Sequence, residues 1–154
     1  MLPEGMTPGE EQEQRMRRLL VDQGYEQPYG TTDAEIRQNL QISGHCADFV
    51  GYNPQTDRWL IAESKGSDLW SAEVQLANTL VALLALRPLD HLKLELQIYT
   101  NPSQYSRLIK EPHGSGGYYR QGDFLGYKQN GDFHFSTILD YPVRIFEVTG
   151  NETN

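Results

Sequence analysis

The chain has 154 residues, of which 38% are hydrophobic and 22% are charged. That length fits one domain and that composition is sufficient for a folded core, so we expect neither a second full domain nor a disordered chain. The single cysteine excludes an internal disulfide framework and a cysteine-rich zinc site, and it is typical of a cytoplasmic protein. The longest apolar run, Leu80 to Leu86, is far shorter than the ~20 residues that span a bilayer, so no membrane segment is expected.

The charged side chains are 13 basic and 21 acidic, which gives a net charge of -8. The excess acid is concentrated in residues 1–35, which hold three basic and eight acidic side chains. This balance argues against a protein that coats nucleic acid through its overall charge. A local surface for nucleic acid is still open between Arg107 and Lys128, where four basic side chains accompany two acidic ones.

In chain order, the first expected element is a helix over residues 9–23. Thr7 is a suitable N-cap for it and Gly24 a suitable end. The apolar residues between Ile36 and Ile42 then alternate with polar ones, which predicts a strand that ends at Ser43-Gly44.

An antiparallel hairpin and a long helix are expected next. The turn sequence 53–57 separates two apolar stretches, and Pro88 ends a long helical pattern. The expected elements are strands over 46–52 and 58–64, a helix from Ser67 or Asp68 to Leu86, and a strand over 92–99.

The last third of the chain is expected to extend the same domain. It reads as a short helix over 102–110, a glycine-containing loop over 111–122, and strands over 124–128, 133–139 and 143–148. The order of elements predicts an α/β (α+β) fold, in which a mixed sheet is flanked by helices. We therefore expect one domain over 1–154, with a core over about 10–100 and a C-terminal elaboration over 101–154.

Three charged residues, Asp48, Glu63 and Lys65, lie within the apolar strands of the expected hairpin. Burying such charges costs several kcal/mol unless they are paired or bind a metal. Asp48 and Glu63 are equally far from the centre of the turn, so their side chains are expected to face each other about 5 Å apart. Two carboxylates at that distance repel unless a cation lies between them, and oxygen ligands favour Mg²⁺ or Mn²⁺. Lys65 would orient an attacking water or stabilise charge on a phosphate.

This arrangement resembles the PD-(D/E)xK nuclease superfamily, which has the restriction-endonuclease-like fold. That family carries an acid on one strand, a short hairpin and Glu-x-Lys on the next strand, matched here by Asp48 and Glu63-Ser64-Lys65. The resemblance implies that Asp48, Glu63 and the backbone carbonyl of Ser64 hold Mg²⁺ or Mn²⁺ and that Lys65 assists the attacking water. It also implies that Gln75, in the following helix, positions a metal-bound water or a phosphate.

The first helix adds to this resemblance. Holliday-junction resolvases of the superfamily have a Glu followed eleven residues later by Gly and an aromatic residue, and Glu13 precedes Gly24-Tyr25 by eleven. Glu13 would then complete the metal site, with Glu11 as the alternative. The run from Glu11 to Thr79 is also similar to the N-terminal nuclease domain of type I restriction subunits. The chain departs from the pattern at Ala47, where Pro is common, and at Thr79, where an aromatic residue is usual.

The function that these residues predict is a metal-dependent nuclease. Its expected partner is nucleic acid, with DNA favoured over RNA, and a homodimer or a larger complex is an open possibility. The alternatives are a non-catalytic member of the same fold that binds a partner, and an unrelated α/β interaction module with Glu63 and Lys65 as a surface pair. The nucleic-acid surface is expected outside the matched core. Its candidate residues are Arg107, Lys110, Tyr118, Tyr119, Arg120 and Lys128.

Overall fold

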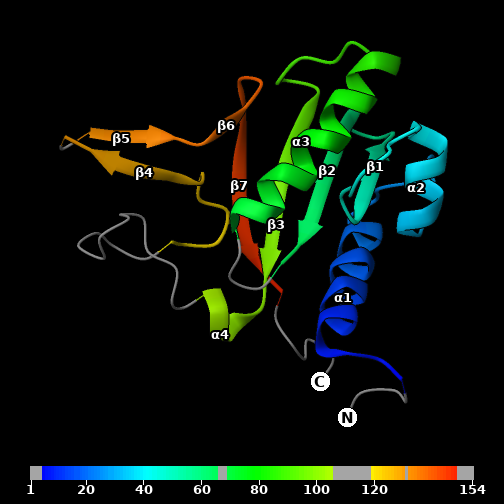
Figure 1. Cartoon of the computed structure of the whole chain (residues 1–154), viewed down its shortest axis with the longest axis horizontal. Coiled ribbons are helices and arrows are strands. Elements are labelled where there is room, and N and C mark those ends of the chain that lie inside the picture. Colours follow the sequence, from blue (N-terminus) through cyan, green and yellow to red (C-terminus); the bar gives the residue numbers. More distant parts are fainter. Residues whose placement is uncertain (1–4, 66–68, 106–118, 131, 149–154) are drawn as a thin grey trace.

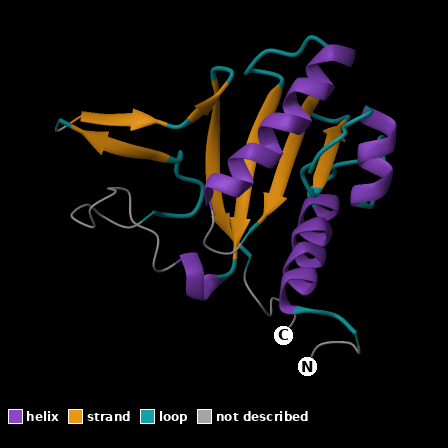
Figure 2. Ribbon diagram, in the orientation of Figure 1, coloured by secondary structure: helices purple, strands orange, loops and turns teal. Residues whose placement is uncertain are grey.

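The computed structural model describes residues 5–65, 69–105, 119–130 and 132–148. These residues form a mixed sheet of five strands flanked by helices, which confirms the expected α/β class (Figures 1 and 2). The elements in chain order are α1 (Pro8–Asp22), α2 (Asp33–Leu40), β1 (Phe49–Asn53), β2 (Arg58–Ser64), α3 (Leu69–Leu86), β3 (Leu94–Thr100), α4 (Pro102–Tyr105), β4 (Gly126–Gln129), β5 (Asp132–Phe135), β6 (Thr137–Ile138) and β7 (Tyr141–Glu147).

The sheet has the strand order β1-β2-β3-β7-β6. β1 and β2 form the expected antiparallel hairpin, whereas β2, β3 and β7 run parallel to one another. β4 and β5 form a separate two-stranded sheet, and this second hairpin projects from the side of the main sheet opposite α1 and α2 (Figure 1). The carboxyl ends of β2 and β3 therefore lie together at one edge of the sheet, next to α1.

Two apolar clusters hold the helices on the two faces of the sheet. α3 and α2 belong to the larger cluster, in which Leu76, Leu80 and Leu83 are fully buried. α1 belongs to the smaller one, where Met16 and Leu20 pack with residues of β1, β2 and β3. Each such side chain stabilises the fold by about 1.5–3 kcal/mol, so α1 is held firmly enough to position polar groups on the same helix face.

Among the described residues, α3 is the one helix that is long and apolar enough to cross a membrane by length and composition. One of its faces is buried in the larger cluster of the sheet, with Ala72, Leu76, Thr79, Leu80 and Leu83 inward. The helix therefore serves the core of this fold. Its outer face is unusually apolar as well, since Trp70, Val81 and Leu86 are all more than half exposed.

The prediction of a strand between Ile36 and Ile42 is wrong, because this segment forms α2. Thr32 is the N-cap, and its hydroxyl accepts a hydrogen bond from the backbone N–H of Glu35. Ile36 and Leu40 are four residues apart, so on a helix they share one face, and both are buried. The same even spacing fits a strand equally well, and only the cap residue and the acidic first turn distinguish the two.

The first helix is confirmed within one residue of its expected ends. Thr7 and Glu10 form a reciprocal capping box, and the helix ends before Gly24, which has a φ of +104° that suits glycine. After this turn, Glu26 forms an isolated antiparallel bridge with Tyr52 on β1. This single bridge, rather than a full strand, occupies the outer edge of the hairpin.

The C-terminal third contains the expected kinds of element with different bounds. The strand expected over 133–139 is divided into β5 and β6, and the strand expected over 143–148 begins earlier, at Tyr141. The helix expected over 102–110 is seen as α4, and its residues after Tyr105 lie outside the described part, as do residues 111–118 of the expected loop. The expected caps of α3, Ser67 and Asp68, also lie outside the described residues.

Candidate metal centre and active site

Three carboxylates meet at the edge of the sheet where β2 and β3 end. One oxygen from each of Glu13, Asp33 and Asp48 lies within 4.8 Å of the other two. Glu13 precedes the buried Met16 by three residues, so it shares the inward face of α1 but lies beyond the apolar contact. Asp33 is the first residue of α2, and Asp48 directly precedes β1. These three residues could hold a metal ion.

Asp48 and Glu63 face each other as the hairpin arithmetic predicts. Phe49 pairs with Ala62, so the next pair outward is Asp48 and Glu63. The Asp48 backbone N–H donates to Glu63 Oε1 at 3.1 Å, and the Ser64 N–H donates to Asp48 Oδ2 at 2.9 Å. Glu63 is only 2% exposed and Asp48 6%, so both carboxyl groups are buried.

Lys65 lies on the same edge. Its Nζ is 3.8 Å from Glu63 Oε2, and its side chain is 30% exposed. The backbone on either side of its Cα is held, because the Lys65 N–H donates to the Tyr99 carbonyl at 2.8 Å and its carbonyl accepts from Gln12 Nε2 at 3.1 Å. Gln12 also donates to the Ser64 hydroxyl at 2.9 Å. α1 thus fixes the end of β2, and with it the position from which the Lys65 ammonium reaches the cleft.

Arg17 ties two of the carboxylates together. Its guanidinium lies 2.9 Å from Glu13 Oε2 and 3.4 Å from Asp33 Oδ1, and it donates to the Thr31 carbonyl at 2.6 Å. The side chain is 13% exposed. It therefore links α1 to the start of α2 and holds both carboxylates beside Asp48. Glu11, the alternative to Glu13, instead forms an ion pair with Arg15.

The acids at this edge are short of positive charge. Burial, followed by the nearby Glu13 carboxylate, raises the pKa of Asp48. Burial, followed by the charge of Asp48, likewise raises the pKa of Glu63. Burial and Glu13 raise the pKa of Asp33, against the opposing effect of Arg17. A raised carboxyl pKa means that the charged form lacks compensation, which a bound cation would supply.

The donor set fits a divalent cation. The contacts above join four carboxyl groups and two basic side chains: Glu13, Asp33, Asp48, Glu63, Arg17 and Lys65. When all six are ionised, this cluster carries two excess negative charges. One divalent ion balances that excess, and carboxylate oxygens are the ligands of Mg²⁺ and Mn²⁺. Glu13, Asp33 and Asp48 have the required proximity, while a ligand role for Glu63 and for the Ser64 carbonyl stays a prediction.

The cluster lines an open cleft of about 490 Å³. Its lining residues are Thr7, Pro8, Gly9, Glu10, Gln12, Glu13, Asp33, Asp48, Glu63, Ser64, Lys65, Gln75 and Asn101. Gln75 is thus at the cleft as expected, and its side-chain oxygen is buried with no hydrogen-bond partner among the described residues. The Thr79 hydroxyl holds the backbone here, because it donates to the Gln75 carbonyl and accepts from the Ala47 N–H.

Three of the six residues expected to contact nucleic acid lie in the described part of the chain: Tyr119, Arg120 and Lys128. Tyr119 is 5% exposed, and its hydroxyl donates to the Gly126 carbonyl at 2.8 Å, so most of its ring is packed inside the fold. Arg120 is exposed, and Lys128 lies on β4, in the hairpin on the far side of the sheet from α1 (Figure 1). Arg107, Lys110 and Tyr118 lie outside the described residues.

Sequence reasoning missed Asp33, Arg17 and Gln12. Asp33 had a usable signal, because Thr32 followed by two acids and an i,i+4 apolar pair marks the start of a helix. Arg17 had a partial signal, because Glu13 lies four residues before it on the same helix, but nothing in the sequence indicated its contact with Asp33. Gln12 had none, since its partners Ser64, Lys65 and Tyr99 are far away in the sequence. Their roles follow from the angle at which α1 crosses the end of the sheet.

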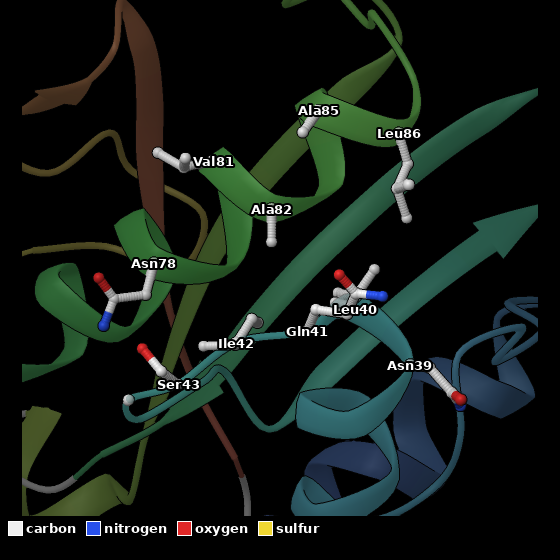
Figure 3. Close-up of a pocket in the computed structure, with 11 residues that line it drawn as sticks. Asn39, Leu40, Gln41, Ile42, Ser43, Asn78, Val81, Ala82, Ala85 and Leu86 are labelled. Atoms are coloured by element: carbon white, nitrogen blue, oxygen red, sulfur yellow. The ribbon is translucent and has the colours of Figure 1, made fainter.

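A larger hollow, of about 630 Å³, lies elsewhere, between α3 and the segment that follows α2 (Figure 3). Its lining residues are Asn39, Leu40, Gln41, Ile42, Ser43, Gly44, Asn78, Val81, Ala82, Ala85 and Leu86. None of these is ionisable, so this hollow has no group for acid–base or metal chemistry. The smaller acidic cleft is the better candidate for an active site.

Comparisons of this chain with protein-family models, with curated proteins and with solved structures find no match.

Proposed function

We propose that this chain is a metal-dependent nuclease of the PD-(D/E)xK kind, which hydrolyses phosphodiester bonds of nucleic acid. The observation that carries the proposal is the buried pair Asp48 and Glu63 at the end of the hairpin, joined by Glu13 and Asp33 and flanked by Lys65. Such unbalanced charge is costly in a core and is characteristic of functional sites.

Glu13, Asp33 and Asp48 would hold Mg²⁺ or Mn²⁺, with Glu63 as a further ligand. A divalent ion in this position supplies positive charge to the phosphoryl oxygen and lowers the pKa of a bound water. Lys65 projects into the cleft beside Glu63 and stabilises negative charge that develops on the phosphate. Gln75, which also lines the cleft, offers its amide to a water or a phosphate oxygen.

The second candidate is a non-catalytic protein of the same fold that binds a partner. The net charge of -8 favours it, because nucleases usually attract their substrate electrostatically. Under this alternative the acidic cluster keeps its cation for stability, and Lys65 serves only as the partner of Glu63.

A nicking assay separates the two. Supercoiled plasmid is incubated with the protein and Mg²⁺ or Mn²⁺, beside Asp48→Asn and the matched control Asp57→Asn. Asp57 lies in the turn of the same hairpin and pairs with Lys93 at 2.8 Å, outside the cleft. We expect nicking by the wild type and by Asp57→Asn, and loss of about 100-fold or more in Asp48→Asn. No nicking by any of the three on plasmid or on single-stranded substrate would favour the partner-binding alternative.

A further inference from the structure

A smaller hollow, of about 350 Å³, adjoins the acidic cleft and is distinct from the 630 Å³ hollow beside α3. Its lining residues are His45, Lys65, Trp70, Ser71, Val74, Gln75 and Asn78. Lys65 and Gln75 line both spaces, so the two are immediate neighbours. A chain molecule with one unit at the carboxylates would therefore place the neighbouring unit in this hollow.

Trp70 is the unusual wall of this hollow. It is the second residue of α3, and 73% of its surface is exposed, whereas Trp59, the other tryptophan of the chain, is only 6% exposed. An indole offers a large flat apolar face, and proteins normally bury most of it. Val74, one turn further along α3 and 40% exposed, extends the same apolar wall.

The rest of the lining is polar. The Asn78 side-chain nitrogen donates to the His45 carbonyl at 3.0 Å, which ties the segment before β1 to α3. The buried oxygen of Gln75 needs a donor that the described residues do not provide. A flat aromatic face beside amide and imidazole groups matches a nucleobase, which stacks on its face and forms hydrogen bonds along its edge.

We propose that this hollow holds one unpaired nucleobase of the bound strand, stacked on Trp70, next to the phosphate in the acidic cleft. The inference rests on the proposed function and makes it narrower. Bases of an intact duplex are stacked on one another, so a base can reach Trp70 only from a single strand, a flap, a branch or a flipped position. The substrate is then nucleic acid with at least one unpaired nucleotide beside the scissile bond.

The fluorescence of Trp70 gives a direct test. In a Trp59→Phe background, Trp70 is the single tryptophan, and stacking by a base is expected to quench it. The ligands are a short single-stranded oligonucleotide, the blunt duplex of the same sequence and a single strand with abasic sites, all with Ca²⁺ in place of Mg²⁺ to prevent cleavage. We expect quenching by the single strand, and little by the duplex or by the abasic strand.

Binding by fluorescence anisotropy supplies a second measurement that does not depend on the Trp59→Phe protein. Trp70→Ala is expected to weaken single-strand binding by roughly 5- to 150-fold, while Trp70→Phe keeps most of it. Val81→Ala is the matched control, because Val81 is exposed on the same helix but lines the other hollow. Equal affinity of Trp70→Ala and wild type, or equal quenching by the abasic strand, overturns the base site.

The failure of this inference is distinct from the failure of the proposed function. If cleavage depends on Asp48 but Trp70→Ala cleaves every substrate as fast as the wild type, the nuclease function is supported and the base site is rejected. Base-dependent quenching without any nicking keeps the base site and assigns it to a binding protein.

Discussion

The two ends of the β1–β2 hairpin differ in how their acidic side chains are compensated by positive charge. At the turn end, Asp57 accepts hydrogen bonds from Lys93 and Tyr52, both at 2.8 Å, and Lys93 lowers the pKa of Asp57. At the open end, Asp48 and Glu63 face each other with their pKa values raised by burial and by neighbouring acids. Matched charges belong to the structure, whereas buried unmatched charges indicate a missing ligand.

The turn end is also sealed by aromatic rings. Trp59 is 6% exposed, its ring centre lies 5.0 Å from that of Tyr52 and 6.0 Å from that of Tyr29, and the Arg87 guanidinium lies 4.9 Å from it. The three contacting residues come from three different segments of the chain. Removing the ring would open a cavity that the surrounding backbone cannot close, so this end should be sensitive to truncation.

The largest expected effect is on stability at the turn end. Trp59→Ala should lower the free energy of unfolding by about 3–5 kcal/mol, as large-to-small changes of buried aromatic residues do. Urea unfolding followed by circular dichroism measures it. A loss below about 1 kcal/mol would mean that the aromatic contacts at the turn end contribute little to the stability of the fold.

A ligand effect of similar size is expected at the open end. Mg²⁺ or Mn²⁺ at 100 times its dissociation constant should stabilise the wild type by about 2.7 kcal/mol, by mass action. Asp48→Asn should abolish this gain, while Asp57→Asn should keep it. Thermal melts with metal or with a chelator measure the difference, and identical melting temperatures at all metal concentrations would contradict a metal site.

Replacing an acid whose ionisation the fold opposes should stabilise the metal-free protein. The amide of Glu63→Gln can still accept from the Asp48 N–H and can donate to the Asp48 carboxylate, so it mimics the protonated acid. We expect a gain of about 1 kcal/mol in the metal-free state, together with loss of metal binding. A strongly destabilised variant would show instead that the Glu63 carboxylate is a structural partner of Lys65.

The pH dependence of stability should reflect the same repulsion. In the unfolded chain these carboxyls titrate near pH 4, whereas in the metal-free fold the pKa values of Asp48 and Glu63 are raised. Between these values the folded state binds more protons than the unfolded one, so its stability falls as pH rises above about 4. Metal binding needs the ionised acids and should strengthen over the same range. Urea unfolding at a series of pH values gives the slope of the unfolding free energy against pH for the wild type and for Glu63→Gln. Equal slopes for the two proteins would contradict a raised pKa at Glu63.

The smallest effect is expected from the exposed pair at the turn. Lys93 and Asp57 are 49% and 64% exposed, and solvent screens such pairs strongly. Lys93→Ala should leave the melting temperature almost unchanged, and nicking should be as in the wild type. A large change in melting temperature would show that this pair contributes more than its exposure suggests.

Much of the hairpin could be predicted because its signals are local. The turn at 53–57 sets the register, and the register alone places Asp48 opposite Glu63. The segment around Ile36 could not be assigned from spacing, because residues four apart lie on one face of a helix and also on one face of a strand. The wrong choice there concealed Asp33, whose place depends on the start of α2.

What the sequence by itself determined is the set of elements with strong periodicity and the pair of acids that face each other across one turn. What only the tertiary structure decided is the rest of the cluster: Glu13 rather than Glu11, the arrival of Asp33, and the link through Arg17. The physical reason is the distance along the sequence between the residues whose contacts decide each feature. Strand register follows from the few residues of a turn, whereas the meeting of α1, α2 and β1 depends on how Met16 and Leu20 on one face of the sheet, and Ile36 and Leu40 on the other, pack at the same time.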